Sequence, residues 1–322
     1  MSGRTTVVLG MMLVAAFLLS LLVPWSAFGA LFEQDRALAV SVLVELRLPR
    51  ALLALTYGAM LGASGAAIQG LFANPLASPD LTGTTSGAAL GAVITAYIFG
   101  FAAPIALSVG SVVGALLALL LLLGLAGARA ETATLLLAGL AISALAGALT
   151  TLALALAPSP FAFYDAYDWL MGSLVDRSLA QAAFAALPAF LTIALLLRLR
   201  APLDSLTLGE EVAQSLGHDV TRLRREIVCL TAFGVGSCVA ICGAIGFIGL
   251  VAPIFARRLT GGHPGRAILP AAAIGATLLL AADLLVRTAP LGRTLPIGVV
   301  TALLGAPFFL WLVAHTRWKL AR

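Results

Sequence analysis

The stretch VELRLPRALLALTYGAMLGASGAAIQGLFANPLASP, residues 44–79, decides the fold class. Behind Arg47 and Arg50 the chain carries no charged residue until Asp80. A helix needs about 20 apolar residues to cross the hydrocarbon core of a bilayer. The stretch therefore predicts a membrane-spanning helix with two arginines at one of its ends.

The rest of the chain has the same character. Of its 322 residues, 61% are hydrophobic and only 10% are charged, and its mean hydropathy is +1.08. Soluble domains carry about 25% charged residues. The apolar runs do not alternate as barrel strands do, so we predict an all-α integral membrane protein. We attribute the net charge of +5 to cytoplasmic loops and expect no nucleic acid partner.

Windows without charge place the spans. One window, 81–128, is too long for a single helix and is expected to break at 100–104, where glycine and proline occur. Another, 227–256, crosses either once or over and partly back, which gives nine or ten crossings. The windows are 5–32, 51–79, 81–128, 132–164, 178–197, 227–256, 267–282 and 294–316.

The basic residues favour ten crossings, because loops on the cytoplasmic side carry an excess of Lys and Arg. With ten crossings and both termini inside, thirteen of the 19 basic residues face the cytoplasm, against nine with nine crossings. A retained first span is favoured over a cleaved signal peptide. The residues left outside are Arg36, Arg47, Arg50, Arg177, Arg287 and Arg293.

We expect one transmembrane domain, 1–322, with one long cytoplasmic loop at 198–226. Asp204 or Ser205 is expected to cap a short helix in this loop, and Gly217 is expected to end it. Such an element suits docking to a soluble partner. An ordinary solvated loop is the alternative.

The segment ANPLASPDLTG, residues 73–83, combines proline, glycine and polar residues at the end of the second span. Irregular backbone at membrane depth is typical of a pathway or gate, with a tight turn as the alternative. Residues 65–75 and 243–253 share glycines and a final proline, which we ascribe to chance in a chain rich in glycine and alanine.

No catalytic constellation is evident. The three histidines are far apart, there is no phosphate-binding GxxxxGK[ST] loop, and Cys238 and Cys242 are interpreted as small apolar residues of a packed helix. Asp283 is the main ionisable residue within a span. Since ion-coupled carriers usually need carboxylates within the membrane, the energy for transport is expected to come from another chain.

Six stretches together resemble the membrane subunits of ABC importers for ferric siderophores, haem and cobalamin. The resemblance implies a type II importer permease fold with about ten transmembrane helices in the bacterial inner membrane. It implies a second permease copy, two ABC ATPase subunits that bind ATP and Mg²⁺, and a periplasmic or lipid-anchored binding protein. No cofactor, metal or enzymatic activity is expected in this chain. The stretches are 47–92, 135–151, 169–174, 206–217, 243–253 and 295–312.

The resemblance also implies roles for single residues. Arg47, Arg50 and Arg287 are expected to receive acidic residues of the binding protein at the outer mouth. The alternative is that Arg47 pairs with Glu45 and Arg287 with Asp283, or that all three reach lipid phosphates.

On the cytoplasmic side, Asn74 and Leu76 are expected to line the gate, with Thr132 and Ala133 as its second element. Coupling to the ATPase is expected at Leu206, Glu210, Glu211, Ala213, Leu216 and Gly217.

An importer of an iron complex, most of all a ferric siderophore, is the leading hypothesis. Haem and cobalamin are alternatives within the class, and an ion-coupled secondary transporter and a membrane scaffold lie outside it. The chain departs from the family pattern at Ile254, where histidine is usual, and at Thr294, where glutamate is usual.

Overall fold

The computed structural model describes residues 3–101, 103–126, 132–156, 160–288 and 295–320. Within these ranges the chain forms helices joined by turns, without a strand, which confirms the all-α prediction. The helices are α1 (Gly3–Leu22), α2 (Trp25–Gln34), α3 (Arg36–Ser41), η1 (Val42–Arg47), α4 (Leu48–Leu71), α5 (Thr84–Val93), η2 (Ile94–Ile98), α6 (Pro104–Ala126), α7 (Thr132–Ala155), α8 (Pro160–Leu170), α9 (Leu179–Arg198), α10 (Arg200–Ser205), η3 (Leu206–Leu208), α11 (Glu210–Ser215), α12 (Val220–Cys242), α13 (Ile248–Leu259), α14 (Pro264–Thr288) and α15 (Ile297–Leu320).

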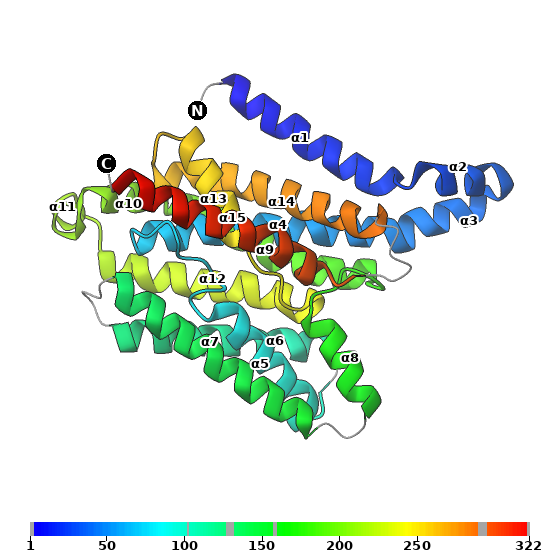
Figure 1. Ribbon diagram of the computed structural model, residues 1–322, viewed down its shortest axis with the longest axis horizontal. Helices are drawn as coiled ribbons and strands as arrows, with labels where there is room; N and C mark the ends of the chain where they lie inside the picture. The colour runs from blue at the N-terminus through cyan, green and yellow to red at the C-terminus, as the bar shows by residue number, and fades with distance from the viewer. Residues whose placement is uncertain (1–2, 102, 127–131, 157–159, 289–294, 321–322) are drawn as a thin grey trace.

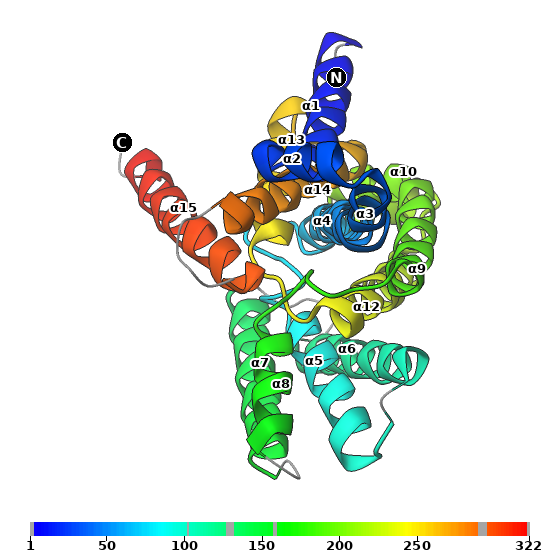
Figure 2. The same ribbon diagram turned by 90° about the vertical axis from the view of Figure 1, so that its right-hand side faces the viewer.

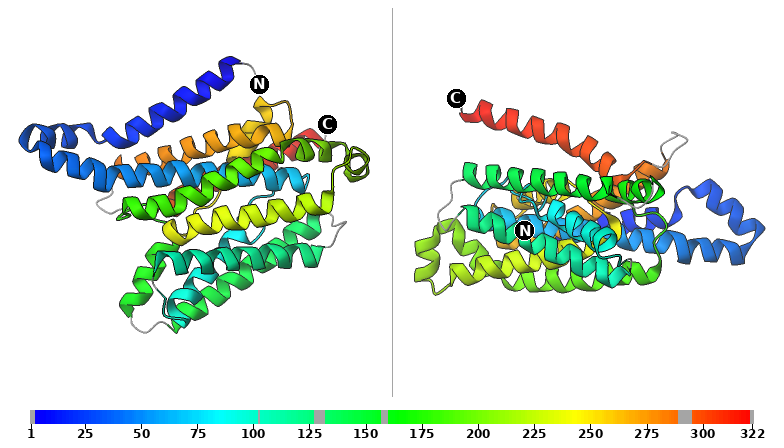
Figure 3. Two further views of the ribbon diagram at one scale, coloured as in Figure 1. Left: turned by 180° about the vertical axis from the view of Figure 1, so that it is seen from behind. Right: turned by 90° about the horizontal axis from the view of Figure 1, so that it is seen from below.

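Most helices run lengthwise through the molecule (Figures 1 and 3). The start of α1, the end of α15, α10 and α11 lie toward the same end of the molecule, called here the α11 end. The helices α2 and α3 project from the opposite end, called the α3 end (Figure 1). Figure 2 looks along the helices and shows α4 surrounded by α9, α12, α13 and α14. The end of α9, the start of α12 and the end of α13 lie at the α11 end (Figure 1), and they carry Arg198, Arg222 and Arg257, which the charge count places on one side of the membrane.

The centre of the bundle is α4, of whose 24 residues 20 are buried. Small residues allow its backbone to touch its neighbours. A Cβ atom at Gly58 or Gly62 would collide with the backbone of α14, and one at Gly65 would collide with the carbonyl oxygen of Gly249 on α13. Helices in lipid associate through such close packing, because no hydrophobic effect separates protein from lipid.

The window 227–256 goes over and partly back, as the ten-crossing prediction requires. The helix α12 ends at Cys242, and the chain resumes as α13 after a break at 243–247. Gly243 and Phe247 adopt positive φ angles of 71° and 65° in this break. With 12 residues, α13 is about 18 Å long, too short to span a bilayer.

The two similar segments 65–75 and 243–253 lie side by side. Besides the contact of Gly65 with Gly249, the Gln69 side-chain amide donates to the carbonyl oxygen of Leu250 at 3.2 Å. Gly65 and Gly249 therefore lie where the backbones of the two segments meet.

Two predicted windows are corrected. The first, 5–32, is two helices, because Pro24 separates α1 from α2 and lacks a backbone N–H. The window 132–164 is also two helices, because it contains all of α7 and the first residues of α8. Among the described residues, six helices are long and apolar enough to cross a membrane, so the count of ten crossings stays a prediction.

A continuous helix of 36 residues runs from α3 through η1 into α4, that is, over 36–71. At 1.5 Å per residue it is about 54 Å long. The hydrocarbon core is about 30 Å thick, so its α3 portion extends beyond the bundle (Figure 1). Arg47 and Arg50 lie where this helix leaves the bundle.

Candidate functional site

One buried carboxylate organises the arginines at the α3 end. The Nε atom of Arg50 lies 2.7 Å from Oδ1 of Asp283, and a terminal nitrogen of Arg287 lies 2.5 Å from Oδ2. The Asp283 side chain is fully buried, whereas those of Arg50 and Arg287 are 16% and 10% exposed. Asp283 therefore links α4 to the last turn of α14, and Arg287 forms the pair with Asp283 that was the alternative to docking, whereas the docking role stays a prediction.

The same cluster holds the end of α1. Arg47 donates to the carbonyl oxygens of Leu21 and Val23 at 2.8 and 3.4 Å, and Arg287 donates to that of Ser20 at 2.7 Å. The last carbonyls of a helix have no partner within it and carry partial negative charge, so guanidinium groups suit them. Burial lowers the pKa of Arg47 from its ordinary value.

Segment 73–83 is folded by its own hydrogen bonds. The buried Asn74 accepts a bond from the Leu76 backbone N–H at 2.9 Å and donates its own backbone N–H to Gln69 at 3.1 Å. Ala73 adopts a positive φ of 47°. Asn74 thus fixes the turn, while Leu76 is half-buried.

Asp80 is a site residue that sequence reasoning missed. Its Oδ1 accepts from the Thr85 hydroxyl at 2.7 Å, and its Oδ2 accepts from the Phe247 backbone N–H at 3.0 Å. One carboxylate thus connects segment 73–83 to the break between α12 and α13. The sequence signal that could have identified Asp80 is its position at the end of NPLASPD, a segment that two prolines prevent from being helical.

The second predicted gate element begins where expected, since α7 starts at Thr132. The side chains of Thr132 and Ala133 lie outside the described residues. Farther along α7, the Ser143 hydroxyl donates to the backbone carbonyl of Asp80 at 3.3 Å. The helix and the segment are therefore in contact.

The predicted coupling loop forms α10, η3 and α11 at the α11 end (Figure 1). The expected cap is wrong: Gly209, with φ at 101°, precedes α11. Asp204 instead accepts from the Gly265 backbone N–H at 2.7 Å, and Ser205 donates within its own helix. Gly217 follows α11 with φ at 86°, as predicted.

The loop presents apolar side chains outward. Leu208 and Leu216 are 64% and 59% exposed, while Ala213 is fully buried. Leu206 packs partly against the core. Glu210 forms a 2.8 Å ion pair with Arg224, and Glu211 is exposed. A surface with exposed leucines and acidic groups is suited to a protein partner.

Comparison with known proteins agrees with this arrangement. The FecCD transport family matches residues 6–315. The chain belongs to the FecCD transport family. It is a multi-pass membrane permease, and its relatives are transport proteins rather than enzymes.

Two relatives in the FecCD family cover nearly the whole chain. The Fe(3+)-citrate import system permease protein YfmE of Bacillus subtilis is 36% identical over 317 residues, 95% of this chain and 94% of that protein. The vitamin B12 import system permease protein BtuC of Vibrio cholerae is 39% identical over 303 residues, 91% of this chain and 86% of that protein.

A solved structure described as an inward-facing conformation of a metal-chelate type ABC transporter has the same fold. It matches with a TM-score of 0.83 and 32% identity, over 98% of this chain and all of that chain. This confirms the importer permease fold.

At the two departures from the family pattern, Ile254 is buried in α13, and Thr294 lies outside the described residues. Cys238 and Cys242 are buried, as interpreted, and Cys229 is exposed. The part of the chain that the structure describes contains no group of three or more potential metal ligands.

Proposed function

We propose that this FecCD permease is the membrane subunit of an ATP-driven importer that carries an iron complex, most of all a ferric siderophore, across the bacterial inner membrane. One observation carries the proposal: the helix ends that hold the arginine cluster and the loop that exposes Leu208 and Leu216 lie at opposite ends of one bundle (Figure 1). The permeases named above for Fe(3+)-citrate and vitamin B12 support this class of cargo. Cobalamin and haem are the alternative substrates.

At the α11 end, we assign the loop to an ATPase subunit that binds ATP and Mg²⁺. Leu208 and Leu216 would fill an apolar cleft of that subunit, with Glu211 at the rim. The basic residues of this end favour its placement in the cytoplasm, with both chain termini.

At the α3 end, we assign the arginine cluster to a substrate-binding protein. Arg47, Arg50 and Arg287 carry three positive charges against the single negative charge of Asp283. The cluster therefore attracts acidic groups although its arginines are paired. Two permease copies, related by a twofold axis, would present it twice to a two-lobed partner, and the cargo would pass between them by alternating access.

Uptake into vesicles tests the proposal. We expect vesicles that contain this permease to accumulate a ferric siderophore only when the ATPase, the binding protein and ATP are supplied. Accumulation driven by an ion gradient without the ATPase would establish a secondary transporter instead.

The loop assignment has a sharper test. Glu211→Arg should abolish substrate-stimulated ATP hydrolysis by the assembled complex while the protein still inserts, because the reversed charge faces the ATPase. Glu33→Arg, an exposed glutamate on α2, is the matched control and should leave hydrolysis within about twofold of the wild type. Normal stimulation in Glu211→Arg would disprove the assignment.

A further inference from the structure

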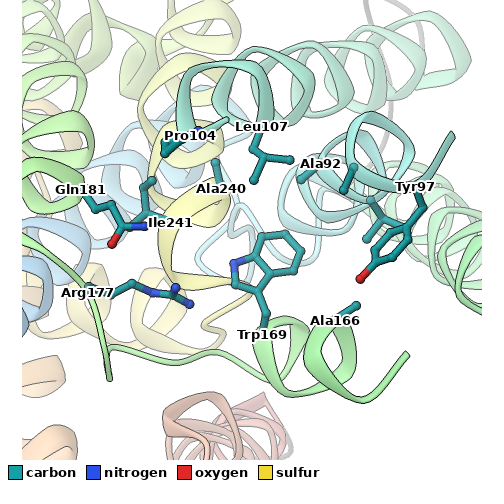
Figure 4. A pocket seen from close by; sticks show the side chains of 12 residues that line it. Ala92, Tyr97, Pro104, Leu107, Ala166, Trp169, Arg177, Gln181, Ala240 and Ile241 are labelled. Atoms are coloured by element: carbon teal, nitrogen blue, oxygen red, sulfur yellow. The ribbon is translucent and has the colours of Figure 1, made fainter. Parts of the chain in front are cut away.

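A cavity of about 300 Å³ lies at the α3 end, between α8 and the helices behind it (Figure 4). It is separate from the arginine cluster, segment 73–83 and the coupling loop. Its walls come from α5, η2, α6, α8, α12 and the start of α9. The side chains used below are Ala92, Tyr97, Leu107, Trp169, Arg177 and Ile241.

Arg177 is the charged group of this cavity. Figure 4 shows its guanidinium directed toward the space beside Trp169. Its Nε atom is buried without a hydrogen-bond partner, and no described residue forms an ion pair with it. A cation withdrawn from water is costly unless an anion faces it. Arg50 and Arg287 have Asp283 for this purpose, whereas the partly exposed Arg177 has no carboxylate of a described residue within ion-pair distance, so an anion from outside the chain would complete it.

The other side chains that line the cavity indicate which kind of molecule would bear the anionic group. Trp169 and Tyr97 face the cavity from α8 and η2 (Figure 4), and such aromatic residues concentrate at the headgroup level of membranes. Ala92, Leu107 and Ile241 add an apolar wall. A ligand that fits has an anionic head next to a short apolar body. The planar guanidinium is especially suited to phosphate, which it binds through two parallel hydrogen bonds.

The loop that carries Arg177 is held in place by backbone hydrogen bonds. The Ser173 N–H donates to the carbonyl oxygen of Cys242 at 2.8 Å, and the Ile297 N–H donates to that of Gly172 at 3.0 Å. A ligand in the cavity therefore contacts α8 and also this hydrogen-bonded loop. Its presence would set the position of α8 against α5 and α6.

We propose that this cavity binds the phosphate group of a membrane phospholipid, with Arg177 as the partner of the phosphate and Trp169 against the glycerol and first methylene groups. Since the α3 end faces outward in the proposed function, this lipid would belong to the outer leaflet, and that placement rests on the proposed function. The binding itself does not, because it is measured without transport.

Native mass spectrometry of the full-chain protein in detergent tests the site. The protein is titrated with dihexanoyl phosphatidylglycerol, with dihexanoylglycerol as the analogue without phosphate, and with inorganic phosphate. We expect saturable binding of the phospholipid and at least tenfold weaker binding of both other probes. Arg177→Gln should raise the dissociation constant for the phospholipid about tenfold, as expected for a lost hydrogen bond to a charged group.

Two further variants complete the experiment. Arg177→Lys retains the charge and should bind with an affinity between those of the wild type and Arg177→Gln. Arg36→Gln removes an exposed arginine at the same end and should bind like the wild type. If Arg177→Gln does not fold, the affinity of Arg177→Lys for the phospholipid and the affinities of the wild type for the three probes still test the proposed site.

Equal affinities for the phospholipid and the analogue without phosphate would overturn the proposal, and so would unchanged binding in Arg177→Gln. Binding of inorganic phosphate as tight as that of the phospholipid would make this a site for a free anion and overturn the lipid assignment.

Discussion

The helices α4 and α1 are both apolar and of similar length, yet they occupy opposite environments. In α4, 20 residues are buried, and glycine, alanine and serine dominate its contacts. In α1, Ser20 is the one buried residue among those described, and Val8, Met11, Leu18 and their neighbours face outward. The sequence of α1 is the more hydrophobic of the two.

The difference teaches that hydrophobicity does not identify the centre of a membrane bundle. Lipid accepts leucine and valine as readily as a protein interior does, so the most apolar helix has no reason to be buried. Small residues mark the central helix instead, because they let backbones approach. The contrast between α4 and α1 can be tested at three places.

The largest effect is expected when a small residue of α4 is enlarged. Gly65→Leu should prevent assembly of the native bundle, because the new side chain would displace the backbone of Gly249. Gly10→Leu is the matched control on α1, where a Cβ meets nothing within 4 Å. The yield of monodisperse protein in size-exclusion chromatography and its melting temperature are the measurements. Equal losses in both variants would contradict the contrast.

A smaller but severe effect is expected at the ion cluster that connects α4 to α14. Asp283→Asn leaves Arg50 and Arg287 buried without their shared carboxylate, which should cost about 3–5 kcal/mol. Glu226→Gln removes a carboxylate from the exposed pair with Arg222 and should cost at most about 1 kcal/mol. Thermal or denaturant unfolding in detergent measures both. A small loss in Asp283→Asn would show that the cluster does not stabilise the bundle.

The smallest effect is expected where α1 is attached. Arg47→Gln removes the donor to Leu21 and Val23 and should cost about 1 kcal/mol, so the end of α1 detaches more often. A cysteine introduced at Leu22, in a variant without the three native cysteines, should then react with a thiol reagent several times faster. Arg36→Gln should leave that rate unchanged. An unchanged rate in Arg47→Gln would show that lipid alone holds α1.

The sequence was sufficient for the fold class, the break at 100–104, the return within 227–256, and the family, because apolar length, glycine, proline and charge signal these directly. It was not sufficient for the partners of Arg50 and Asp80. Asp283 is more than 200 residues from Arg50, and Phe247 binds Asp80 through its backbone N–H, which no residue type reveals. Pairing of Arg287 with Asp283 was predictable because four residues separate them on one helix.

The roles of Arg47, Arg50 and Arg287 in docking, of Asn74, Leu76, Thr132 and Ala133 in gating, and of the loop in coupling stay predictions. The low exposure of the Arg50 and Arg287 side chains bears on how they could take part in docking. An acidic partner would meet guanidinium groups that are already neutralised in part, so docking should depend on the net charge of the cluster more than on any single pair.

The continuous helix over 36–71 has a mechanical consequence. It is a stiff rod of about 54 Å that the bundle holds along its α4 part, while its α3 part projects as an arm. Its α4 arm touches α13 and α14 through glycine contacts, and its α3 arm projects past Arg47 into the space beyond the bundle. Because the rod is stiff, a tilt of the α3 arm tilts the α4 arm in the same sense, without a flexible joint except the π-helical turn η1. A push on the projecting tip would therefore arrive among the small residues of α4.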